Sequence, residues 1–476
     1  MVVGAPDPSL TPAAGMLAVS ELVDRLGVVS ALDAGIGPIK TRNRGLSGGQ
    51  LLVSLAGAQL LGQDALAGLD RVRADTAGRV LSVVPTLAST TAGSLARRFG
   101  PGQLAGVEAG LARLVDRWLG LLPATLRSPL QLRPPTIDLD STEVEVYGRA
   151  KDGVAYNYLG QRAGRPHLAS WAEAGLPLAA DLLAGDQDVR PRCADLLRRA
   201  LAGLPAAVCG RPRVRADAGY FTAELAHAAA AAGADWAIAA KRTSAFWREL
   251  AAVPEQAWTR ARDMPGAQVA VMDYAPAGWP PDAYTIVRRV KVDAADISGD
   301  PRSRRRRTIP ADQLALALGG ELDHAYAVSF IVTNLPTTST ADVVSVEAWF
   351  RWRTDIEERF REAKLGAGLN HLPLRARRRQ HGVDVGRAAG RGHLGDAADP
   401  DRDQRDQRHR PDGPAAARAA AGARTGDLPR RPNHPAAATG ARAVAARPVP
   451  DQGLTAPGLN PRVRPAETPP RQGLWN

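Results

Sequence analysis

The sequence predicts an α/β protein in which a mixed β-sheet carries helices on its faces and follows an all-α N-terminal segment. Three observations predict it. Residues 16 to about 122 place apolar side chains at helical spacing, residues 132–240 change to short strand-like runs alternating with helices, and apolar patterning stops after residue 375. At 476 residues the chain is too long for one ordinary core, so we expect two or three domains.

The first segment, residues 1–130, is expected to form a helical N-terminal DNA-binding domain. Apolar residues from Met16 to Val29 follow a helical period, and Ser47 is placed to begin another helix. Residues 85–91 are compatible with a turn leading into a recognition helix, whose Arg97 and Arg98 would meet DNA phosphates. A capped surface helix fits the same pattern, so both interpretations stay open.

A strand-like alternation of residues begins after Pro134-Pro135 with Thr136–Asp140, and residues 144–147 extend it. The hairpin order and the later alternation of strands with helices predict a mixed sheet. The expected strands cover residues 136–140, 167–174, 176–183, 214–216 and 236–240, and the expected helices cover residues 194–204 and 223–232.

Residues 243–340 interrupt this rhythm with further strand-like runs at 268–272, 284–292 and 326–333. We interpret them as a β-rich insertion within a second domain, residues 131–375. The insertion includes a basic loop, Arg302–Arg307, which either contacts DNA phosphates or is simply solvated.

The last hundred residues differ from the rest in composition. After Arg375 there is no Lys, Ile, Phe, Tyr, Met or Cys, and Ala, Arg, Pro, Gly and Asp dominate. Such a segment buries too little apolar area to offset chain entropy, which predicts a disordered, low-complexity tail over residues 376–476. A reading-frame shift in a GC-rich gene is the second explanation, because the change is abrupt and out-of-frame GC-rich codons encode mainly these residues.

The overall composition limits which classes of protein the chain can belong to. The net charge is +12, but the tail from Arg375 holds 19 Arg against 9 Asp and 1 Glu, so only three net charges remain for the rest. Charge alone therefore does not indicate nucleic acid. Two cysteines are too few for a disulfide framework or a cysteine-built zinc site. No run is long and apolar enough to span a bilayer, and the N-terminus lacks the layout of a signal peptide, which predicts a cytoplasmic protein.

Acidic residues stand where two predicted strands end. Asp138 and Asp140 alternate with Ile137 and Leu139, so the two carboxylates share one face of a strand. Asp217 ends a second strand, directly before Ala218-Gly219. A single such Asp is usually a turn or cap residue, but a distant pair at strand ends is better placed for a site than for a core.

The third candidate segment is residues 349–364, which fit one amphipathic helix. Trp349, Trp352, Ile356 and Phe360 fall on its apolar face. Phe350, Arg353, Glu357 and Lys364 fall on an adjoining stripe at the edge of that face. A plain amphipathic helix with an Arg353–Glu357 ion pair explains the same pattern, so this segment decides nothing alone.

Taken together, these residues resemble the DDE transposases of bacterial insertion sequences. The resemblance rests on the order Asp-Ser-Thr, Arg-Ala-Asp-Ala-Gly and a helical Tyr-x2-Arg-x3-Glu-x6-Lys signature, and it covers residues 16–375. Within that group, the sequence resembles insertion-sequence family 1380 in particular. The chain matches the signature at Arg353, Glu357 and Lys364, whereas Phe350 replaces its tyrosine.

The resemblance implies a ribonuclease H-like fold, with Asp on the central strand and Glu on a following helix. It implies that Asp140, Asp217 and Glu357 bind two Mg²⁺ or Mn²⁺ ions, with Asp138 as the alternative first ligand. Arg353 and Lys364 would then face the DNA backbone or steady the carboxylates. The implied partners are double-stranded DNA, as terminal inverted repeats and target, and a second copy of the chain in a homodimer.

Three functions follow as hypotheses. The first is a metal-dependent DNA transposase acting at the bacterial nucleoid. The second is a catalytically impaired DNA-binding remnant, because the altered C-terminus follows the signature helix directly. The third is a standalone nuclease of similar fold. Helper ATPase activity is not expected, since the sequence holds no Gly-x-x-x-x-Gly-Lys-Ser/Thr loop.

Overall fold

The structure is a computed structural model that describes residues 7–370, except 43, 148–150 and 152. All of the described residues belong to one compact unit. The predicted tail over residues 376–476, and with it the choice between disorder and a frame shift, lies outside the described residues.

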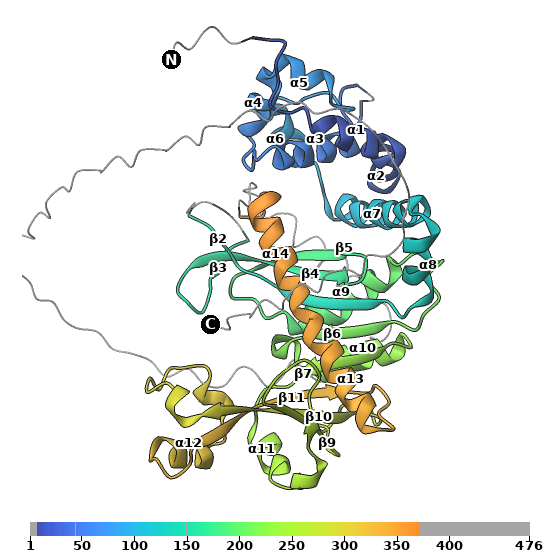
Figure 1. Ribbon diagram of the computed structural model, residues 1–476. Helices are drawn as coiled ribbons and strands as arrows, with labels where there is room; N and C mark the ends of the chain where they lie inside the picture. Colours follow the sequence, from blue (N-terminus) through green and yellow to red (C-terminus); the bar gives the residue numbers. More distant parts are fainter. Residues whose placement is uncertain (1–6, 43, 148–150, 152, 371–476) are drawn as a thin grey trace, which may run out of the picture. The chain divides into compact units, whose positions relative to one another are not determined.

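Eight helices precede the sheet in the described part of the chain (Figure 1). Leu32, Leu51, Leu69 and Leu95 are buried in a core that these helices share. The helices are α1 (Met16–Arg25), α2 (Val28–Ile36), α3 (Gly48–Leu60), α4 (Gly68–Ala74), α5 (Thr76–Val80), α6 (Ser89–Ala96), α7 (Pro101–Leu121) and α8 (Ala124–Leu132).

Local sequence explains where two of these helices begin. Ser47 starts α3 as predicted: its hydroxyl accepts from the Gln50 N–H at 3.2 Å, and the Gln50 side chain accepts from the Ser47 N–H at 3.0 Å. The helical period through residues 16–29 is broken between α1 and α2, because Gly27 adopts a left-handed φ of 57°. A Cβ at Gly27 would lie 2.7 Å from a guanidinium nitrogen of Arg117.

One mixed sheet of eleven strands forms the centre of the described residues that follow. Its order is β2-β4-β1-β6-β7-β11-β10-β9-β8, and β3 and β5 also pair with β4. The strands are β1 (Thr136–Ser141), β2 (Val144–Glu145), β3 (Ala155–Tyr156), β4 (Arg162–Trp171), β5 (Leu176–Ala184), β6 (Arg213–Ala216), β7 (Asp235–Ala239), β8 (Thr259–Arg260), β9 (Ala267–Met272), β10 (Tyr284–Asp293) and β11 (His324–Thr333).

Strand β1 lies where the sheet changes direction. It pairs antiparallel with β4 and parallel with β6, and β6 pairs parallel with β7. The strands of residues 243–340 form no separate sheet, because β11 pairs antiparallel with β7 and so continues the same sheet through β10 and β9. Residues 243–340, which interrupt the alternation of strands and helices in the sequence, thus extend the sheet at one edge.

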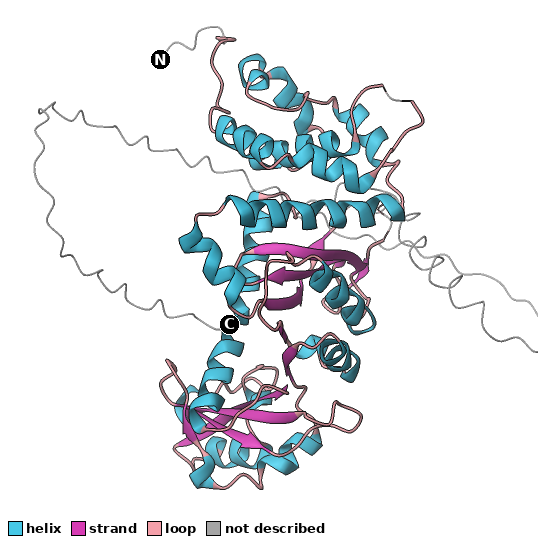
Figure 2. Cartoon of the chain, turned by 90° about the vertical axis from the view of Figure 1, so that its right-hand side faces the viewer, coloured by secondary structure: helices cyan, strands magenta, loops and turns pink. Residues whose placement is uncertain are grey.

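Helices cover both faces of the sheet (Figure 2). Ile137 and Leu139 of β1 pack with Leu196 and Leu225 in the main core. On the opposite face, Val343 packs over Ile286 and Ile331. The helices are α9 (Arg190–Ala202), α10 (Ala223–Ala231), α11 (Ser244–Leu250), α12 (Ala311–Leu318), α13 (Thr340–Arg351) and α14 (Asp355–Gly366), with short 3₁₀ turns η1 (Ala218–Tyr220), η2 (Glu255–Ala257), η3 (Ala294–Asp296), η4 (Arg306–Thr308) and η5 (Trp352–Thr354).

None of the described helices is long and apolar enough to cross a membrane. The alternation of side chains along β1 has a second consequence. Since Ile137 and Leu139 face the main core, Asp138 and Asp140 face the side covered by α13 and α14. Strand geometry therefore directs both predicted acids toward the helix pair that carries Arg353 and Glu357.

Candidate active site

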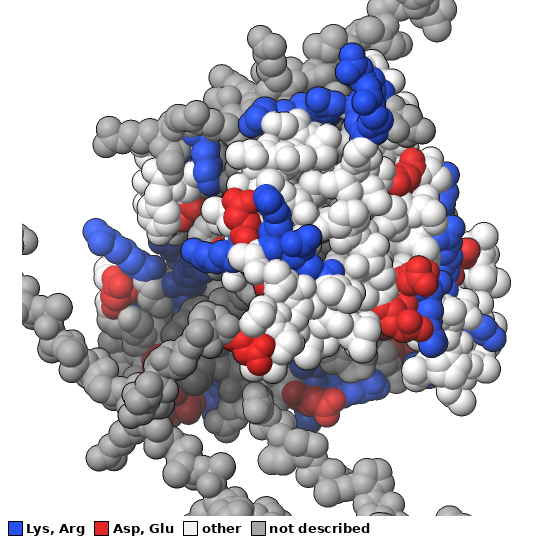
Figure 3. Space-filling model, turned by 90° about the horizontal axis from the view of Figure 1, so that it is seen from above, with Lys and Arg blue, Asp and Glu red and all other residues white. Residues whose placement is uncertain are grey.

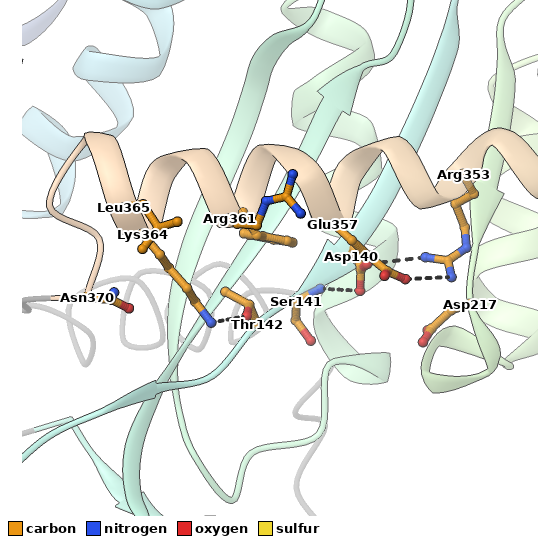
Figure 4. A pocket seen from close by; sticks show the side chains of 11 residues that line it. Asp140, Ser141, Thr142, Asp217, Arg353, Glu357, Arg361, Lys364, Leu365 and Asn370 are labelled. Atoms are coloured by element: carbon orange, nitrogen blue, oxygen red, sulfur yellow. Dashed lines mark hydrogen bonds and ion pairs between the residues drawn. The ribbon is translucent and has the colours of Figure 1, made fainter. Parts of the chain in front are cut away.

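A cleft of about 500 Å³ opens between α14 and the ends of β1 and β6 (Figure 4). We call it the acidic cleft, because three carboxylates from distant parts of the chain line it. Its lining residues are Asp140, Ser141, Thr142, Asp217, Arg353, Glu357, Phe360, Arg361, Lys364, Leu365 and Asn370. It thus brings together five of the charged residues singled out in the sequence, namely Asp140, Asp217, Arg353, Glu357 and Lys364.

Asp140 and Asp217 reach the cleft together because their strands run parallel. The register pairs Leu139 of β1 with Ala216 of β6, so the next residue of each strand emerges at the same edge. The Asp217 Oδ1 also accepts the Gly219 N–H at 2.8 Å and caps η1. The interpretation of Asp217 as a cap residue therefore holds, and the same side chain still lines the cleft.

Asp140 is the most perturbed acid of the cleft. Burial is the main cause that raises the pKa of its carboxyl to about 7; the charges of Asp217 and Glu357 act in the same direction, and Arg353 opposes the rise. The Ser141 N–H donates to Oδ1 at 2.7 Å, and Arg353 Nη1 donates to Oδ2 at 3.2 Å. Burial, with the charges of the two neighbouring acids, thus outweighs the effect of Arg353 on the pKa of this carboxyl.

The helix of residues 349–364 requires a correction. The sequence spacing predicts one helix with Trp352 on its buried face, but α13 ends at Arg351 and η5 intervenes before α14. A 3₁₀ turn advances about 120° per residue instead of about 100°, which changes the face that the following residues present. Trp352, the first residue of η5, is 63% exposed, while Ile356 and Phe360 are buried as predicted.

The break leaves Arg353 close to the acids. Its side chain is 14% exposed, and Nη2 lies 3.9 Å from the Glu357 carboxylate while Nη1 binds Asp140. Glu357 itself is 61% exposed, so its carboxylate remains open to solvent and to a ligand. Arg353 is thus the cation that bridges two of the three carboxylates (Figure 4).

Lys364 lies at the other end of the cleft. Its Nζ donates to the Thr142 hydroxyl at 2.7 Å and to the Glu143 carbonyl at 2.9 Å. Burial lowers the pKa of the ammonium, and the charge of Glu143 opposes this change. The two cations of the signature therefore bracket the carboxylates, with Arg353 on one side and Lys364 on the other (Figure 4).

Asp138, the alternative first ligand, is not among the lining residues. Its side chain is 1% exposed, and both carboxylate oxygens accept from Arg215. Sequence reasoning missed Arg215 as its partner. The signal was present, since the parallel strands β1 and β6 place an arginine two positions before Asp217, opposite Asp138.

The other predicted DNA contacts lie outside the cleft. Arg97 caps the C-terminal end of α6 and Arg98 follows it, both with exposed side chains. In the basic loop Arg302–Arg307, Arg306 donates to the Gly299 carbonyl at 2.8 Å. On the face drawn in Figure 3, Lys and Arg side chains are interspersed with acidic ones over a mostly uncharged surface.

The chemistry of the donors fits divalent magnesium or manganese. Carboxylate oxygens are the hard ligands that these ions prefer, and Asp140, Asp217 and Glu357 supply three such groups to one cleft. Among residues 7–370 as described, no three His, Cys, Asp or Glu side chains are grouped closely enough to hold an ion. The carboxylates line one cleft, with the Arg353 guanidinium between two of them.

The family model described as Transposase DDE domain group 1 matches residues 7–298. Among solved structures, one match is a cryo-EM structure of the piggyBac transposase synaptic complex with hairpin DNA, at 10% identity and a TM-score of 0.33, covering 78% of this chain and 72% of that chain. No curated protein sequence matches.

The fold and the cleft define a mixed α/β protein that gathers carboxylates and cations at one edge of its sheet. The family match covers more than half of the chain, including Asp140 and Asp217, and ends before Glu357. The chain belongs to the Transposase DDE domain group 1 family. It is therefore a member of an enzyme family that carries out DNA transposition.

Proposed function

We propose that this chain catalyses cut-and-paste transposition, in which it cleaves the ends of an insertion sequence and joins them to target DNA. One observation supports the proposal above all others: Asp140, Asp217 and Glu357 come from two strands and a helix and line the same cleft. Such a set of acids is what a metal-dependent phosphodiester-cleaving enzyme requires.

In this proposal Asp140, Asp217 and Glu357 hold two Mg²⁺ or Mn²⁺ ions. Bound divalent ions lower the pKa of an attacking water or 3′-hydroxyl and stabilise the leaving oxygen of an in-line displacement. The single positive charge of Arg353 partly offsets the charges of Asp140 and Glu357 before ions bind. Lys364 is half-buried at the far end, where an ammonium can hold a phosphate of the DNA strand.

We assign the first ligand to Asp140 in preference to Asp138. The carboxylate of Asp138 is enclosed and already satisfied by Arg215, whereas Asp140 borders the cleft. Asp140 also stands on β1, between an antiparallel and a parallel neighbour, and Glu357 follows on a helix. This placement supports a ribonuclease H-like catalytic domain over residues 131–375.

We also propose the insertion-sequence family to which the chain belongs and the DNA that it binds. The Arg353, Glu357 and Lys364 signature supports membership of insertion-sequence family 1380 and a bacterial source. In that setting residues 1–130, including Arg97 and Arg98, bind the terminal inverted repeats. Two copies of the chain hold two DNA ends at the nucleoid in the cytoplasm.

A second candidate function is a DNA-binding remnant with impaired catalysis. The observation that favours it is the abrupt change of composition after Arg375, only a few residues beyond the end of α14. If the native continuation of the chain is lost, the helix that carries Glu357 lacks part of its support. A standalone nuclease of the same fold is the third candidate.

The decisive experiment is an in vitro cleavage assay on duplexes that carry the inverted repeats flanking the gene, with Mg²⁺. The chain is expected to cut the ends and to join them to target DNA. Glu357→Gln is expected to bind the repeats without cutting, while the matched control Glu358→Gln, an exposed neighbour paired with Arg361, keeps both activities. Cleavage by Glu357→Gln would show that the ligand assignment is wrong.

The same assay separates the three candidates. End binding without cleavage by the natural chain, together with cleavage by a version whose reading frame is restored after residue 375, selects the remnant. Nicked products without joined strands select the nuclease. Joined strands from the natural chain establish the transposase.

A further inference from the structure

A buried ion pair lies beside the acidic cleft and takes no part in the chemistry proposed above. The side chains of Asp138 and Arg215 are 1% and 3% exposed. Arg215 Nε donates to Oδ1 at 2.6 Å and Nη2 donates to Oδ2 at 2.8 Å, which is a bidentate arrangement. The two residues are opposite one another on the parallel strands β1 and β6.

The remaining nitrogen of Arg215 reaches from the sheet to helix α13. Nη1 donates to the backbone carbonyl of Trp349, and the guanidinium lies 5.1 Å from the centre of the Trp349 indole ring. The indole Nε1 donates in turn to the Thr136 hydroxyl at 3.2 Å. Trp349 is therefore fixed to β6 through its carbonyl and to β1 through its ring.

The Trp349 carbonyl occupies a special place in the helix. In a continuous α-helix it would accept the N–H of residue 353, four positions later. Here α13 ends at Arg351 and η5 covers Trp352–Thr354. A side chain that inserts at a helix carbonyl is a recognised cause of such a break.

We propose that Asp138 and Arg215 form a positioning pair, which fixes the break between α13 and α14 and thereby places Arg353 and Glu357 beside Asp140. The sequence spacing assigns one unbroken helix that buries Trp352 together with Ile356 and Phe360. With the break, Trp352 faces solvent and Arg353 contacts Asp140 at 3.2 Å. The proposal rests on the proposed function, because it assigns the pair a role in assembling that site.

Energetics favour a geometric role for the pair over a stabilising one. Removing two charges from water costs about as much as their attraction returns, so apolar replacement of a buried pair is often neutral. Asp138 is held on the sheet by a rigid guanidinium fork that lysine cannot reproduce. The pair should therefore matter more to the position of α14 than to the stability of the fold.

The chain offers a matched control for a test. Arg288 Nη1 binds Glu347 Oε1 at 2.7 Å, and Glu347 is fully buried on the same helix α13. This second pair also fixes α13 to the sheet, but neither residue lines the cleft or contacts the Trp349 carbonyl. The variants to compare are Arg215→Lys, the apolar double variant Asp138→Leu/Arg215→Met, and the control Arg288→Lys.

The first readout needs no enzymatic activity. Spin labels at Glu358→Cys on α14 and Asp186→Cys after β5, in the Cys209→Ser background, report the distance between helix and sheet. The natural chain and Arg288→Lys should give the same narrow distribution. Arg215→Lys and the apolar double variant should give a shifted or broadened one. The apolar double variant, which keeps a packed core, decides the outcome if Arg215→Lys fails to fold.

The second readout is the Mg²⁺ concentration that gives half-maximal cleavage of the flanking-repeat duplex. Loss of a group that orients metal ligands typically weakens metal binding or activity about 10- to 100-fold, so Arg215→Lys should need that much more Mg²⁺. Arg288→Lys should keep the natural Mg²⁺ requirement even if its melting temperature falls. Unchanged label distances in both Arg215 variants would overturn the proposal. A natural chain that never cleaves overturns the proposed function instead, and the distances still decide the role of the pair.

Discussion

Replacing Asp140 by asparagine is expected to make the stability of the metal-free protein less dependent on pH. The pKa of the Asp140 carboxyl is raised from 3.8 to about 7, chiefly by burial. Between those two values the folded chain holds a proton that the unfolded chain has lost. The contribution of this group to stability is therefore complete below pH 3.8 and disappears as the pH rises through about 7.

The size of the effect follows from the same values. Each pKa unit corresponds to about 1.4 kcal/mol, so ionising Asp140 in the fold costs about 4 kcal/mol above pH 7. Between pH 5 and pH 8, where the fold can be studied without extreme acid, the ionisation of Asp140 lowers the free energy of unfolding by about 3 kcal/mol. The amide introduced by Asp140→Asn carries no titrating proton, so the stability of that variant lacks this component.

The measurement is equilibrium urea unfolding of the natural chain and Asp140→Asn at pH 5 and pH 8, with a chelator present. The loss of the contact with Arg353 affects the variant at both pH values, so it cancels when the two differences are subtracted. The natural chain should lose about 3 kcal/mol more than the variant on going to pH 8. A double difference below about 1 kcal/mol would refute the reasoning, because Asp140 would then titrate like a solvated acid.

Three further predictions concern the cleft and the helix that borders it. Magnesium should raise the melting temperature of the natural chain with DNA present and raise that of Asp217→Asn much less; a melting curve indifferent to Mg²⁺ would count against a metal site. Lys364→Met should reduce the slope of log DNA affinity against log salt concentration by the equivalent of about one phosphate contact. An unchanged slope would show that Lys364 contacts no phosphate. In urea unfolding, Phe360→Ala should cost about 3 kcal/mol and Trp352→Ala less than about 0.5 kcal/mol, whereas equal losses would contradict the exposed position of Trp352.

The strands that carry the acids were predictable because their signals are local. Alternation through Thr136–Asp140 identifies β1, and the Asp217-Ala218-Gly219 turn identifies the end of β6. Acids at the ends of neighbouring parallel strands meet at one edge, so the common position of Asp140 and Asp217 follows from strand direction. Composition contributed little, since most of the net positive charge lies beyond the described residues.

The break at Trp352 was not predictable from periodicity, because its physical cause lies elsewhere in the chain. A helical wheel assumes one advance per residue, and nothing in residues 349–364 by themselves departs from it. Arg215, far upstream, contacts the carbonyl at which the helix changes. The same limitation applies to β11, whose strand is evident in the sequence while its pairing with β7 is not.

The two acids of β1 show why identical residue types on one strand face acquire different roles. Asp138 receives its counter-charge from Arg215, a neighbour on the sheet itself, so the pair is enclosed on all sides and has no access to a ligand. Asp140 receives its counter-charge from Arg353, which stands on the turn between two helices and borders the open cleft. A divalent ion can compete only for the second acid, because only there does the existing cation share a solvent-accessible space with the carboxylate. The division between structure and chemistry on this strand is thus set by where each arginine originates, one on a rigid strand and the other on a helix break.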